Sequence, residues 1–311
     1  MKSLVTGGAG FIGSHLADRL IGDGHQVVVI DNLSTGKREN LNPKAKFYKI
    51  DICSSRISQI FRKEKPEIVF HYAAQIDVRK SVGSPIEDAK INILGTLNLL
   101  ENCKKYKVKK FIFASTGGAI YGDAGIIPTP ENYPEFPLSP YGIEKLVAEK
   151  YLNYYYKVSG LPYIALRLAN VYGLRQNSQG EAGVIAIFCD KMLSKKQPII
   201  NGDGKQTRDF VFVDDVVEAN ISALKKDKVG IFNIGTARET DVNTLFKKLR
   251  ELTDSKCAKI HGPTLPGEQK RSCLDYSEAK RELGWQPKYS LDKGLKKTVE
   301  WFRNKGSSGK I

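Results

Sequence analysis

The chain has 311 residues, of which 41% are hydrophobic and 27% charged, a length and composition typical of a globular protein with about two domains. No apolar run approaches the ~20 residues of a transmembrane helix, so we expect no membrane span. The five cysteines are widely spaced and form no C-x-x-C pair, which argues against disulfides and a zinc site. We therefore expect a cytoplasmic protein without a metal. The formal net charge of +15 could reflect binding to nucleic acid, to an anionic membrane or to an anionic small molecule, or only a solvated lysine-rich surface.

A glycine-rich turn follows the first predicted strand. Lys2–Thr6 is predicted to be a short strand, and apolar residues from Phe11 onward recur at helical spacing before a second apolar strand at Gln26–Ile30. The turn holds three glycines in G-x-x-G-x-x-G spacing: Gly7, Gly10 and Gly13. Glycine lets the backbone approach a pyrophosphate, and the helix N-terminus supplies free N–H groups and a partial positive charge. This context predicts a dinucleotide site at the turn.

Asp31 directly follows the second strand, 18 residues after Gly13. A carboxylate at that place can accept hydrogen bonds from both hydroxyls of a ribose, and it would repel a 2′-phosphate. The expected cofactor is therefore NAD rather than NADP. The alternative is a glycine turn and a strand-end acid without a ligand, but it does not explain why strand, turn, helix, strand and acid follow in this order.

Strands and helices continue to alternate as far as residue 170. Further strands are predicted at Phe47–Ile50, Ile68–His71, Lys110–Ser115 and Tyr163–Arg167, and helices at Ser55–Arg62, Pro85–Lys105 and Pro140–Val158. Such alternation is typical of a parallel sheet covered by helices on both faces, so the expected fold class is α/β, with a Rossmann-like doubly wound sheet.

Beyond residue 170 the pattern becomes irregular. Short strands and helices are predicted at Pro198–Ile200, Phe210–Phe212, Asp215–Lys225, Ile231–Ile234, Val242–Leu252 and Leu291–Asn304. We expect residues 1–170 to form the NAD-binding domain, with returning segments near 210–234. Residues 171–311 are expected to form mainly a smaller α/β substrate-binding lobe.

Tyr141 and Lys145 form the sharpest catalytic pattern. Their i, i+4 spacing places them on one face of the predicted helix at Pro140–Val158. The pKa of a tyrosine hydroxyl is ordinarily about 10, but a neighbouring ammonium and the positive nicotinamide of an oxidised cofactor both favour the phenolate. The pair is therefore a candidate general base that removes a hydroxyl proton while a hydride leaves.

Several other segments match one known family: Thr6–His15, Asp31–Ser34, Asp51-Ile52, His71–Gln75, Asn92-x-x-Gly95-Thr96, Ser115–Gly122, Arg167–Gly173 and Asn201–Val211. With Tyr-x-x-x-Lys, they make the chain similar to the extended short-chain dehydrogenase/reductase family, the NAD-dependent epimerases and dehydratases. Within that family the chain most resembles UDP-glucose 4-epimerases, from residue 3 to about residue 303. The resemblance implies that UDP-glucose and UDP-galactose are interconverted through a 4-keto intermediate with tightly bound NAD.

The resemblance also implies where the cofactor is held. The backbone N–H groups of Phe11 and Ile12 would meet the pyrophosphate, and Lys145 would hold the nicotinamide ribose as well as tune Tyr141. The other cofactor-binding residues that it implies are Gly7, Gly10 and Gly13 in the turn, Asp31, Asn32 and Ser34 near the adenosine ribose, Asp51 and Ile52 near adenine, Ala73, Ala74 and Gln75 along the groove, Asn92 as their support, and Val171.

The family implies a hydroxyl that shares a proton with the sugar, here Ser115 or Thr116. The segment is one residue longer than usual before Tyr121, so we favour Thr116 and keep Ser115 as the alternative. Sugar 4,6-dehydratases carry an Asp-Glu pair directly after the threonine, where this chain has Gly117 and Gly118. Elimination would lack its proton donor and acceptor, so we expect oxidation and re-reduction at C4, with the glycines leaving room for the sugar to turn.

On the substrate side, the resemblance implies that Asn170 holds the sugar or its diphosphate and that the backbone of Val184–Phe188 meets the uracil. Arg208 is expected at the diphosphate, because a guanidinium donates two parallel hydrogen bonds to a phosphate. Glu268 and Arg271 would approach the uridine ribose and the second phosphate, although a surface arginine is an equal alternative for Arg271.

Other functions remain open at this point. A UDP-glucuronate 4-epimerase or decarboxylase, or a UDP-N-acetylhexosamine 4-epimerase, would use the same catalytic residues on another sugar. A non-catalytic NAD-binding regulator would not need Tyr141, Lys145 and Thr116, and charge alone suggests a nucleic-acid-binding protein. We therefore expect a UDP-sugar as the partner, no nucleic acid and no membrane, and a homodimer formed by the helices at 85–105 and 140–158.

Overall fold

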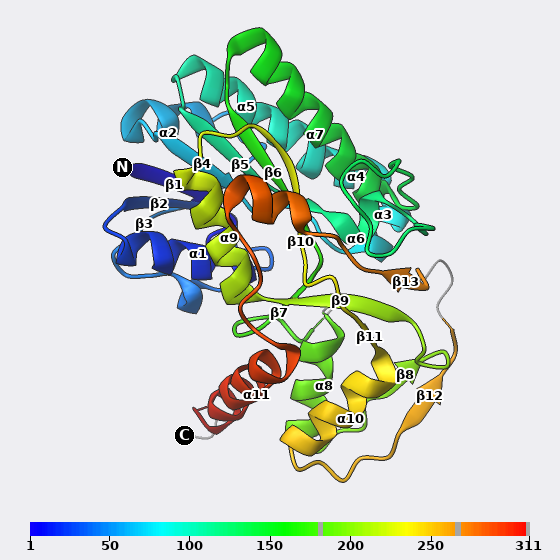
Figure 1. Cartoon of the computed structure of the whole chain (residues 1–311). Helices are drawn as coiled ribbons and strands as arrows, with labels where there is room; N and C mark the ends of the chain where they lie inside the picture. Colours follow the sequence, from blue (N-terminus) through cyan, green and yellow to red (C-terminus); the bar gives the residue numbers. More distant parts are fainter. Residues whose placement is uncertain (180–182, 265–268, 309–311) are drawn as a thin grey trace.

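A seven-stranded parallel sheet forms the centre of the larger lobe (Figure 1). The computed structural model describes residues 1–179, 183–264 and 269–308, with side chains up to residue 305. From edge to edge the sheet consists of β10 (Gly230–Ile234), β6 (Tyr163–Leu168), β5 (Lys110–Thr116), β4 (Ile68–His71), β1 (Lys2–Thr6), β2 (Gln26–Asp31) and β3 (Lys46–Lys49). The strand order reverses between β1 and β4, and ligands of such sheets bind beyond the carboxyl ends of the strands at this switch point.

Helices cover both faces of the sheet. On one face α1 (Phe11–Gly22) and α9 (Val213–Lys225) enclose a core that extends to Trp285. On the other face α2 (Ile57–Glu64), α5 (Gly95–Lys105) and α7 (Pro140–Ser159) enclose a second core. Because both faces are covered, the central strands are buried along nearly their whole length, which explains their continuous apolar runs.

The predicted long helix at Pro85–Lys105 is a helical stretch with an irregular middle. It consists of α4 (Pro85–Ala89), a π-helical turn at Lys90–Leu94 and α5. Short helical segments that were not predicted precede and follow it: a 3₁₀ turn at Arg38–Asn40, α3 (Val78–Gly83) and α6 (Gly117–Ile120). Two of these, α3 and α6, pack against α7.

A smaller lobe lies below the carboxyl ends of the first sheet (Figure 1). Its central strand β9 (Thr207–Phe212) pairs with β7 (Asn170–Tyr172), β11 (Glu239–Asp241) and β13 (Arg271–Ser272), while β8 (Ile199–Asn201) pairs with β12 (Ile260–Gly262). The helices α8 (Val184–Leu193), α10 (Val242–Leu252) and α11 (Leu291–Ser308) enclose a third core with these strands. A π-helical turn at Ala279–Leu283 instead packs against α9 and β10.

The predicted α/β class with a Rossmann-like, doubly wound parallel sheet is confirmed. Within residues 210–234, α9 and β10 belong to the layers of the first sheet, whereas β9 lies in the sheet of the smaller lobe. Among the helices that the structure describes, none is both long and apolar enough to cross a membrane.

Candidate active site

The glycine turn forms a cradle between β1 and α1. Gly7 has a φ of +69°, a left-handed conformation that other residues rarely adopt, and a Cβ there would lie 2.7 Å from the backbone nitrogen of Ala73. A Cβ on Gly13 would lie 2.3 Å from the carbonyl oxygen of Gly7. Since α1 begins at Phe11, the N–H groups of Phe11 and Ile12 are among those without a partner inside the helix. The cradle therefore fits a pyrophosphate at a helix N-terminus.

Asp31 stabilises this turn from the end of β2. Its carboxylate is 7% exposed and accepts hydrogen bonds from the backbone N–H groups of Ala9, at 3.0 Å, and Leu33, at 2.8 Å. Beside it, the side chain of Asn32 donates to Asp51 at 2.8 Å. The structure thus brings three residues that were predicted at the adenosine together, although they come from two separate loops.

Four other predicted cofactor residues contribute in different ways. Gly10 donates its N–H to the carbonyl of Gly7 inside the turn, and Ser34 is exposed. Ile52 buries its side chain against the long helix, so only its backbone is available to an adenine. Val171 packs between the cores of the two lobes.

The groove after β4 is held by a buried asparagine. The side chain of Asn92, in the π-helical turn, accepts from the backbone N–H of Gln75 at 2.9 Å and donates to its carbonyl at 3.0 Å. The same amide donates to Glu144 on α7 at 2.8 Å. Ala73 and Ala74 precede Gln75, and the N–H of Ala73 donates to the hydroxyl of Thr6 at 3.2 Å. The groove and the helix of the candidate base are therefore linked through one side chain.

Tyr141 and Lys145 lie in the first turns of α7, as their spacing predicts. The Lys145 ammonium lies 5.8 Å from the centre of the Tyr141 ring and donates to the carbonyl of Ala114 on β5 at 2.8 Å. Burial lowers the pKa of Lys145 to about 8, against the opposing effect of nearby carboxylates. A partly neutral lysine can hold a ribose hydroxyl and still contribute positive charge.

The pKa of the Tyr141 hydroxyl is raised in the structure, whereas the sequence pattern predicts that it is lowered. Burial, with smaller contributions from the carboxyl groups of Asp88 and Glu144, raises this pKa above its ordinary value. Burial therefore outweighs the effect of the Lys145 ammonium in the chain by itself. The positively charged nicotinamide of a bound oxidised cofactor would add a second charge that favours the phenolate.

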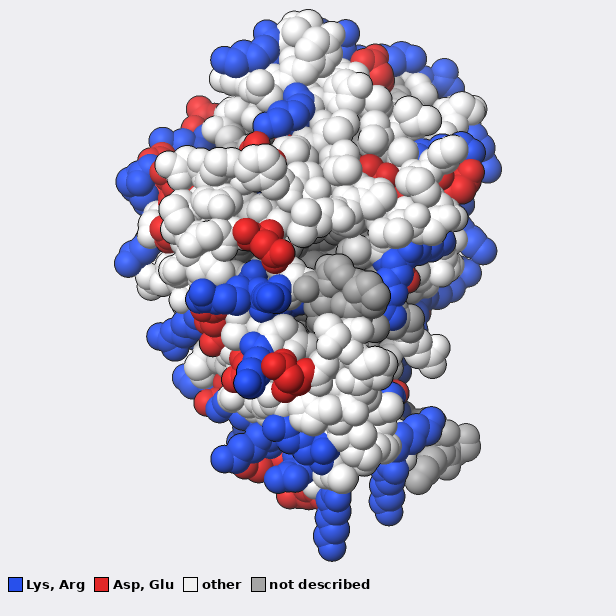
Figure 2. Space-filling view, turned by 90° about the vertical axis from the view of Figure 1, so that its right-hand side faces the viewer, with Lys and Arg blue, Asp and Glu red and all other residues white. Residues whose placement is uncertain are grey.

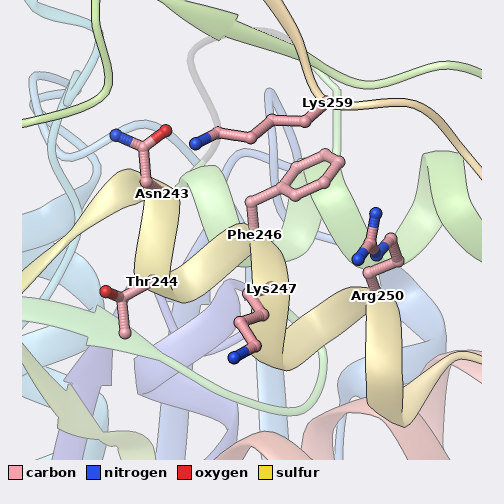
Figure 3. A pocket seen from close by; sticks show the side chains of 6 residues that line it. All are labelled: Asn243, Thr244, Phe246, Lys247, Arg250 and Lys259. Carbon is pink, nitrogen blue, oxygen red and sulfur yellow. The ribbon is translucent and has the colours of Figure 1, made fainter.

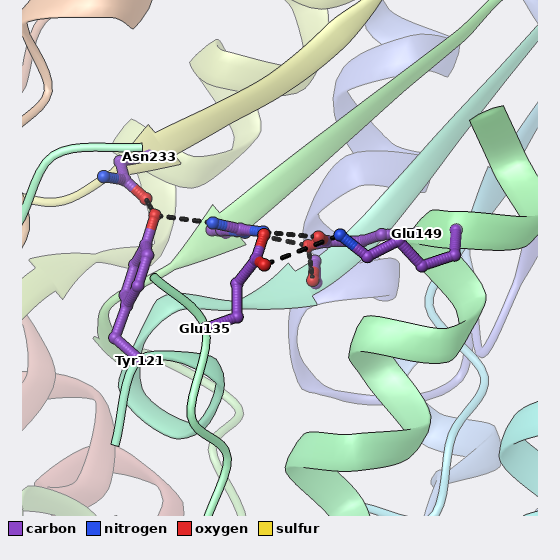
Figure 4. Close-up of polar contacts among 7 residues, drawn as sticks. Tyr121, Glu135, Glu149 and Asn233 are labelled. Atoms are coloured by element: carbon purple, nitrogen blue, oxygen red, sulfur yellow. Dashed lines mark hydrogen bonds and ion pairs between the residues drawn. The ribbon is translucent and has the colours of Figure 1, made fainter. Parts of the chain in front are cut away.

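Ser115 belongs to a buried ion-pair network instead of an open site. Figure 4 shows Tyr121, Glu149 and Asn233 of this network. Its hydroxyl donates to Glu149 of α7, and Glu149 accepts two further hydrogen bonds from Arg167 of β6, at 3.0 and 2.7 Å. Arg167 also donates to the hydroxyl of Tyr121 at 2.8 Å. The Tyr121 hydroxyl in turn donates to the side-chain oxygen of Asn233 at 2.9 Å. The Ser115 hydroxyl therefore makes a structural hydrogen bond in the core.

Thr116 faces the opposite side of β5, because successive side chains of a strand alternate. Its hydroxyl oxygen lies 4.0 Å from the Cβ position of Gly118, and no hydrogen bond from another described residue occupies it. The side-chain oxygens of Asn170 and Ser272 lie 4.0 and 3.8 Å from the same position. Three polar groups from distant parts of the chain therefore surround the space in front of Gly118, which favours Thr116 over Ser115 as the reacting hydroxyl.

The two glycines after Thr116 have different surroundings. A Cβ on Gly117 would lie 2.5 Å from Leu274, so this glycine allows tight packing and leaves no room for a substrate. Gly118 faces the polar space just described. The structure thus leaves open space beside Gly118 and none beside Gly117, which contradicts the expectation of room at Gly117.

The two predicted arginines lie on neighbouring strands and face opposite ways. Arg208 is paired in register with Ser272, whose side chain faces Gly118. Arg271 precedes Ser272 and donates to both carboxylate oxygens of Glu239 on the other side of the small sheet. Arg208 therefore lies on the same face of the small sheet as Ser272 and donates to the carbonyl of Thr207 at 2.7 Å, whereas a diphosphate contact from Arg271 would require the ion pair with Glu239 to break.

The structure describes some, but not all, of the residues that were predicted to contact the uridine. Val184 begins α8 and is half-buried, while the ring of Phe188 packs edge-on against Phe246 in the core of the smaller lobe. Contact between Phe188 and a ligand would thus pass through its backbone. Glu268 lies outside the described residues.

One pocket shares no residue with this site. A pocket on α10 is lined by Asn243, Thr244, Phe246, Lys247, Arg250 and Lys259 (Figure 3). Figure 2 shows lysine and arginine side chains around the rim and over the lower part of one face, interspersed with acidic side chains, and a broad uncharged area above. The positive charge on this face is therefore dispersed, as a solvated surface requires.

Sequence reasoning missed two features of the site. Ser272 comes from a two-residue strand near the end of the chain, and a single serine carries no signal in the sequence. Asp88 and Glu144 are buried acids next to the candidate base. Glu144 stands inside the Tyr-x-x-x-Lys motif, so a carboxyl group one helical turn from a tyrosine base was a signal that could have been used.

Known proteins of similar sequence and structure share this arrangement of lobes. A model of the NAD dependent epimerase/dehydratase family matches residues 3–235. A UDP-glucose 4-epimerase of Mycolicibacterium smegmatis is 44% identical over 98% of this chain and 99% of its own length. The crystal structure of a Thermotoga maritima UDP-glucose 4-epimerase with UDP-glucose has 53% identity and a TM-score of 0.97, covering 98% of this chain and 99% of that one. A Thermus thermophilus UDP-glucose 4-epimerase in complex with NAD has 41% identity and a TM-score of 0.92, covering 97% and 99%.

Proposed function

Because the chain belongs to the NAD dependent epimerase/dehydratase family, as its motifs predict, we propose that it is a UDP-glucose 4-epimerase that interconverts UDP-glucose and UDP-galactose. Similarity to enzymes of this name over nearly the whole chain supports the activity, and the family makes the enzyme NAD-dependent. One observation of the site carries the proposal: the Thr116 hydroxyl, the Asn170 amide and the Ser272 hydroxyl surround Gly118. The chain has Gly117 and Gly118 where sugar 4,6-dehydratases carry an Asp-Glu pair.

Three parts of the chain would hold NAD. The first turn of α1, with Phe11 and Ile12, receives the pyrophosphate, and Asp31 with Asn32 and Asp51 receives the adenosine. The fit rests on the cradle at Gly7 and Gly13, which a Cβ would fill, and on the unpaired N–H groups at the start of α1. Ala73, Ala74 and Gln75 line the groove toward the nicotinamide, with Asn92 as their support.

In the proposed mechanism Tyr141 is the general base. Its phenolate takes the proton of the sugar 4-hydroxyl, and Lys145 holds the nicotinamide ribose and keeps a positive charge nearby. The chemistry that NAD supplies when bound is reversible hydride transfer at C4, outward from one face of the sugar and back to the other. Tyr141 returns its proton to the new hydroxyl, while Thr116 donates a hydrogen bond to the same oxygen throughout. The net change is inversion at C4, with base and cofactor restored.

Between the two hydride transfers the 4-keto sugar must turn over in its pocket. Gly118 leaves space for this turn, since a Cβ at that position would meet the surrounding oxygens only at ordinary contact distances. Asn170 and Ser272 offer hydrogen bonds to either orientation of the sugar. Arg208 would hold the diphosphate as the fixed pivot, and the backbone at Val184 and Phe188 would hold the uracil.

We also propose a homodimer. Apolar side chains are exposed along the predicted contact helices: Ile86 is 72% exposed, Leu94 57%, Tyr154 54% and Val158 62%. These residues lie on the stretch from α4 to α5 and on α7, which pack side by side. Two copies can bury both pairs of helices as a four-helix contact, because large apolar patches on a surface usually mark an interface. Light scattering of the wild type and of a Tyr154→Asp variant tests this: a monomeric wild type would contradict it.

The proposed location is the cytoplasm. All five cysteines are free thiols, and Cys103, Cys189 and Cys273 are buried. Free thiols fit a reducing compartment. Fractionation of the producing cells tests the proposal.

The decisive experiment compares product formation by Tyr141→Phe and wild-type enzyme. The variant keeps the ring but lacks the proton acceptor, so we expect no UDP-galactose from UDP-glucose and unchanged NAD binding. Tyr154→Phe, an exposed tyrosine on the same helix, is the matched control and keeps full activity. Full activity of Tyr141→Phe would refute the mechanism. Offering UDP-glucuronate and UDP-N-acetylglucosamine to the wild type tests the sugar: a strong preference for either would replace UDP-glucose in the proposal.

A further inference from the structure

Two buried carboxyl groups lie beside the proposed catalytic pair. Glu144 stands on α7 between Tyr141 and Lys145, and Asp88 stands on α4, which packs against α7. Glu144 is 3% exposed and Asp88 2%. After burial, Asp88 has the largest effect on the pKa of Glu144, and a hydrogen bond between two neighbouring carboxyl groups requires a proton on one of them. The pair is thus unlike the ion pairs found elsewhere in the core.

The hydrogen-bond partners show where that proton lies. Oδ1 of Asp88 accepts from the side-chain amide of Gln75 at 2.6 Å. Oδ2 of Asp88 is buried and has no other donor among the described residues, so a protonated Glu144 is the group that satisfies it. Glu144 accepts from Asn92 through Oε2, which leaves its other oxygen for the proton. Burial, with Asp88 as the next cause, raises the pKa of Glu144 to about 7.

The pair also connects the base to the cofactor groove. Gln75 binds Asp88 through its side chain and Asn92 through both backbone groups, and Asn92 binds Glu144. A ring of hydrogen bonds therefore joins the loop after β4 to the first turns of α7. Ionisation of Glu144 would place a second negative charge inside this ring and break its link to Asp88.

Few other charges act on Glu144. The titratable groups that face it are Asp88 from α4 and Tyr141 and Lys145 from α7 itself, and Asn92 faces it as a neutral donor. Among the other elements packed on α7, α3 carries Arg79 and Lys80, which are exposed, and α6 carries no titratable residue. In β6, Arg167 is paired with Glu149.

We propose that Glu144 is a positioning residue of the reaction: the proton that it shares with Asp88 holds Tyr141 and Lys145 in place against the cofactor groove and makes the strength of the base depend on pH. This role rests on the proposed function. While the proton is shared, the pair carries a single negative charge. When the proton leaves, the doubled charge disfavours the phenolate of Tyr141 and loosens the contact between α7 and the groove.

The test is Glu144→Gln in the NAD-bound enzyme. An amide donates to Asp88 and accepts from Asn92, so the variant resembles the protonated state at every pH. We expect the ratio of kcat at pH 8.5 to kcat at pH 6 to be at least about threefold higher in the variant than in the wild type, because one interaction with a charge is removed. The matched control is Glu101→Gln, in which an exposed carboxylate of α5 that accepts from Tyr155 is changed in the same way; its pH profile stays that of the wild type.

An infrared titration reads the shared proton without the reaction. The wild type should show a protonated-carboxyl band that disappears as the pH rises through about 7, and Glu144→Gln should lack it. If the glutamine variant does not fold, Asp88→Asn serves instead: its amide donates to Glu144, so the band is lost at neutral pH and the step in kcat moves to lower pH. A band and a pH profile that are the same in wild type and variants overturn the inference while the proposed function stands. A titrating band in an enzyme that makes no UDP-galactose overturns the proposed function, and the positioning role with it.

Discussion

Ser115 and Thr116 are neighbours on β5, and removing their hydroxyls one at a time separates a structural group from a catalytic one. Ser115→Ala deletes a hydrogen bond to the buried carboxylate of Glu149, and a bond to a charged group contributes about 1.5–3 kcal/mol. Glu149 keeps both hydrogen bonds from Arg167, so we expect the lower end of that range. For a chain of this size such a loss lowers Tm by about 2–3 °C. The activity measured well below Tm should change less than about threefold, since the change does not touch the proton transfer.

Thr116→Val should have the opposite effects. Valine keeps the shape of threonine, and the lost hydroxyl has no hydrogen-bond partner among the described residues, so the Tm should stay within about 1 °C of the wild type. A group that assists proton transfer contributes about 10²–10⁴-fold to the rate, so kcat should fall by at least about a hundredfold. Initial rates of UDP-galactose formation and thermal unfolding, measured on both variants, test the two effects together. If Ser115→Ala loses as much kcat as Thr116→Val with no change in Tm, the assignment of Thr116 is refuted.

Three further outcomes follow from the geometry. Gly117→Ala would place a Cβ 2.5 Å from Leu274 and should destabilise the fold by about 1–3 kcal/mol, whereas Gly118→Ala should fold normally and lower kcat by narrowing the turning space; equal stabilities in denaturant would contradict the distinction. Because the folded-state pKa of Glu144 is raised to about 7 from an ordinary ~4.3, the free energy of unfolding should decrease by up to about 3 kcal/mol as pH rises from about 4.5 to 7. Glu144→Gln should remove this contribution in urea titrations across that range, and an unchanged slope would count against the raised pKa. Arg167→Met should cost about 3–5 kcal/mol by leaving Glu149 buried and unpaired, and a loss below about 1 kcal/mol in the same assay would show that the ion pair does not stabilise the fold.

Features that depend on neighbours in the chain could be predicted from the sequence. The glycine spacing at Gly7 and Gly13 predicts the cradle, because strand, turn and helix are consecutive and the turn geometry permits no side chain. The i, i+4 spacing of Tyr141 and Lys145 places both side chains on one helical face in any structure that keeps the helix. The alternation of elements predicts a parallel sheet with both faces covered, since parallel strands need crossover helices.

Decisions between neighbouring candidates needed the tertiary structure. Whether the Ser115 or the Thr116 hydroxyl is free for a substrate depends on which face of β5 meets α7, and the structure places Ser115 against the buried Glu149. Gly117 and Gly118 look alike in the sequence, yet Leu274 fills the space beside one of them and leaves the other open.

The groups around Gly118 come from β5 of the first sheet and from β7 and β13, which both pair with β9 in the small sheet, so the packing of the two lobes brings them together. The cofactor turn, the catalytic helix and the class of fold could be read from the chain alone, because each follows from local spacing. Packing between distant segments decided which hydroxyl is free, which arginine is occupied by Glu239, and that Asp88 and Glu144 are both buried beside the candidate base, because burial and long-range contacts set those outcomes.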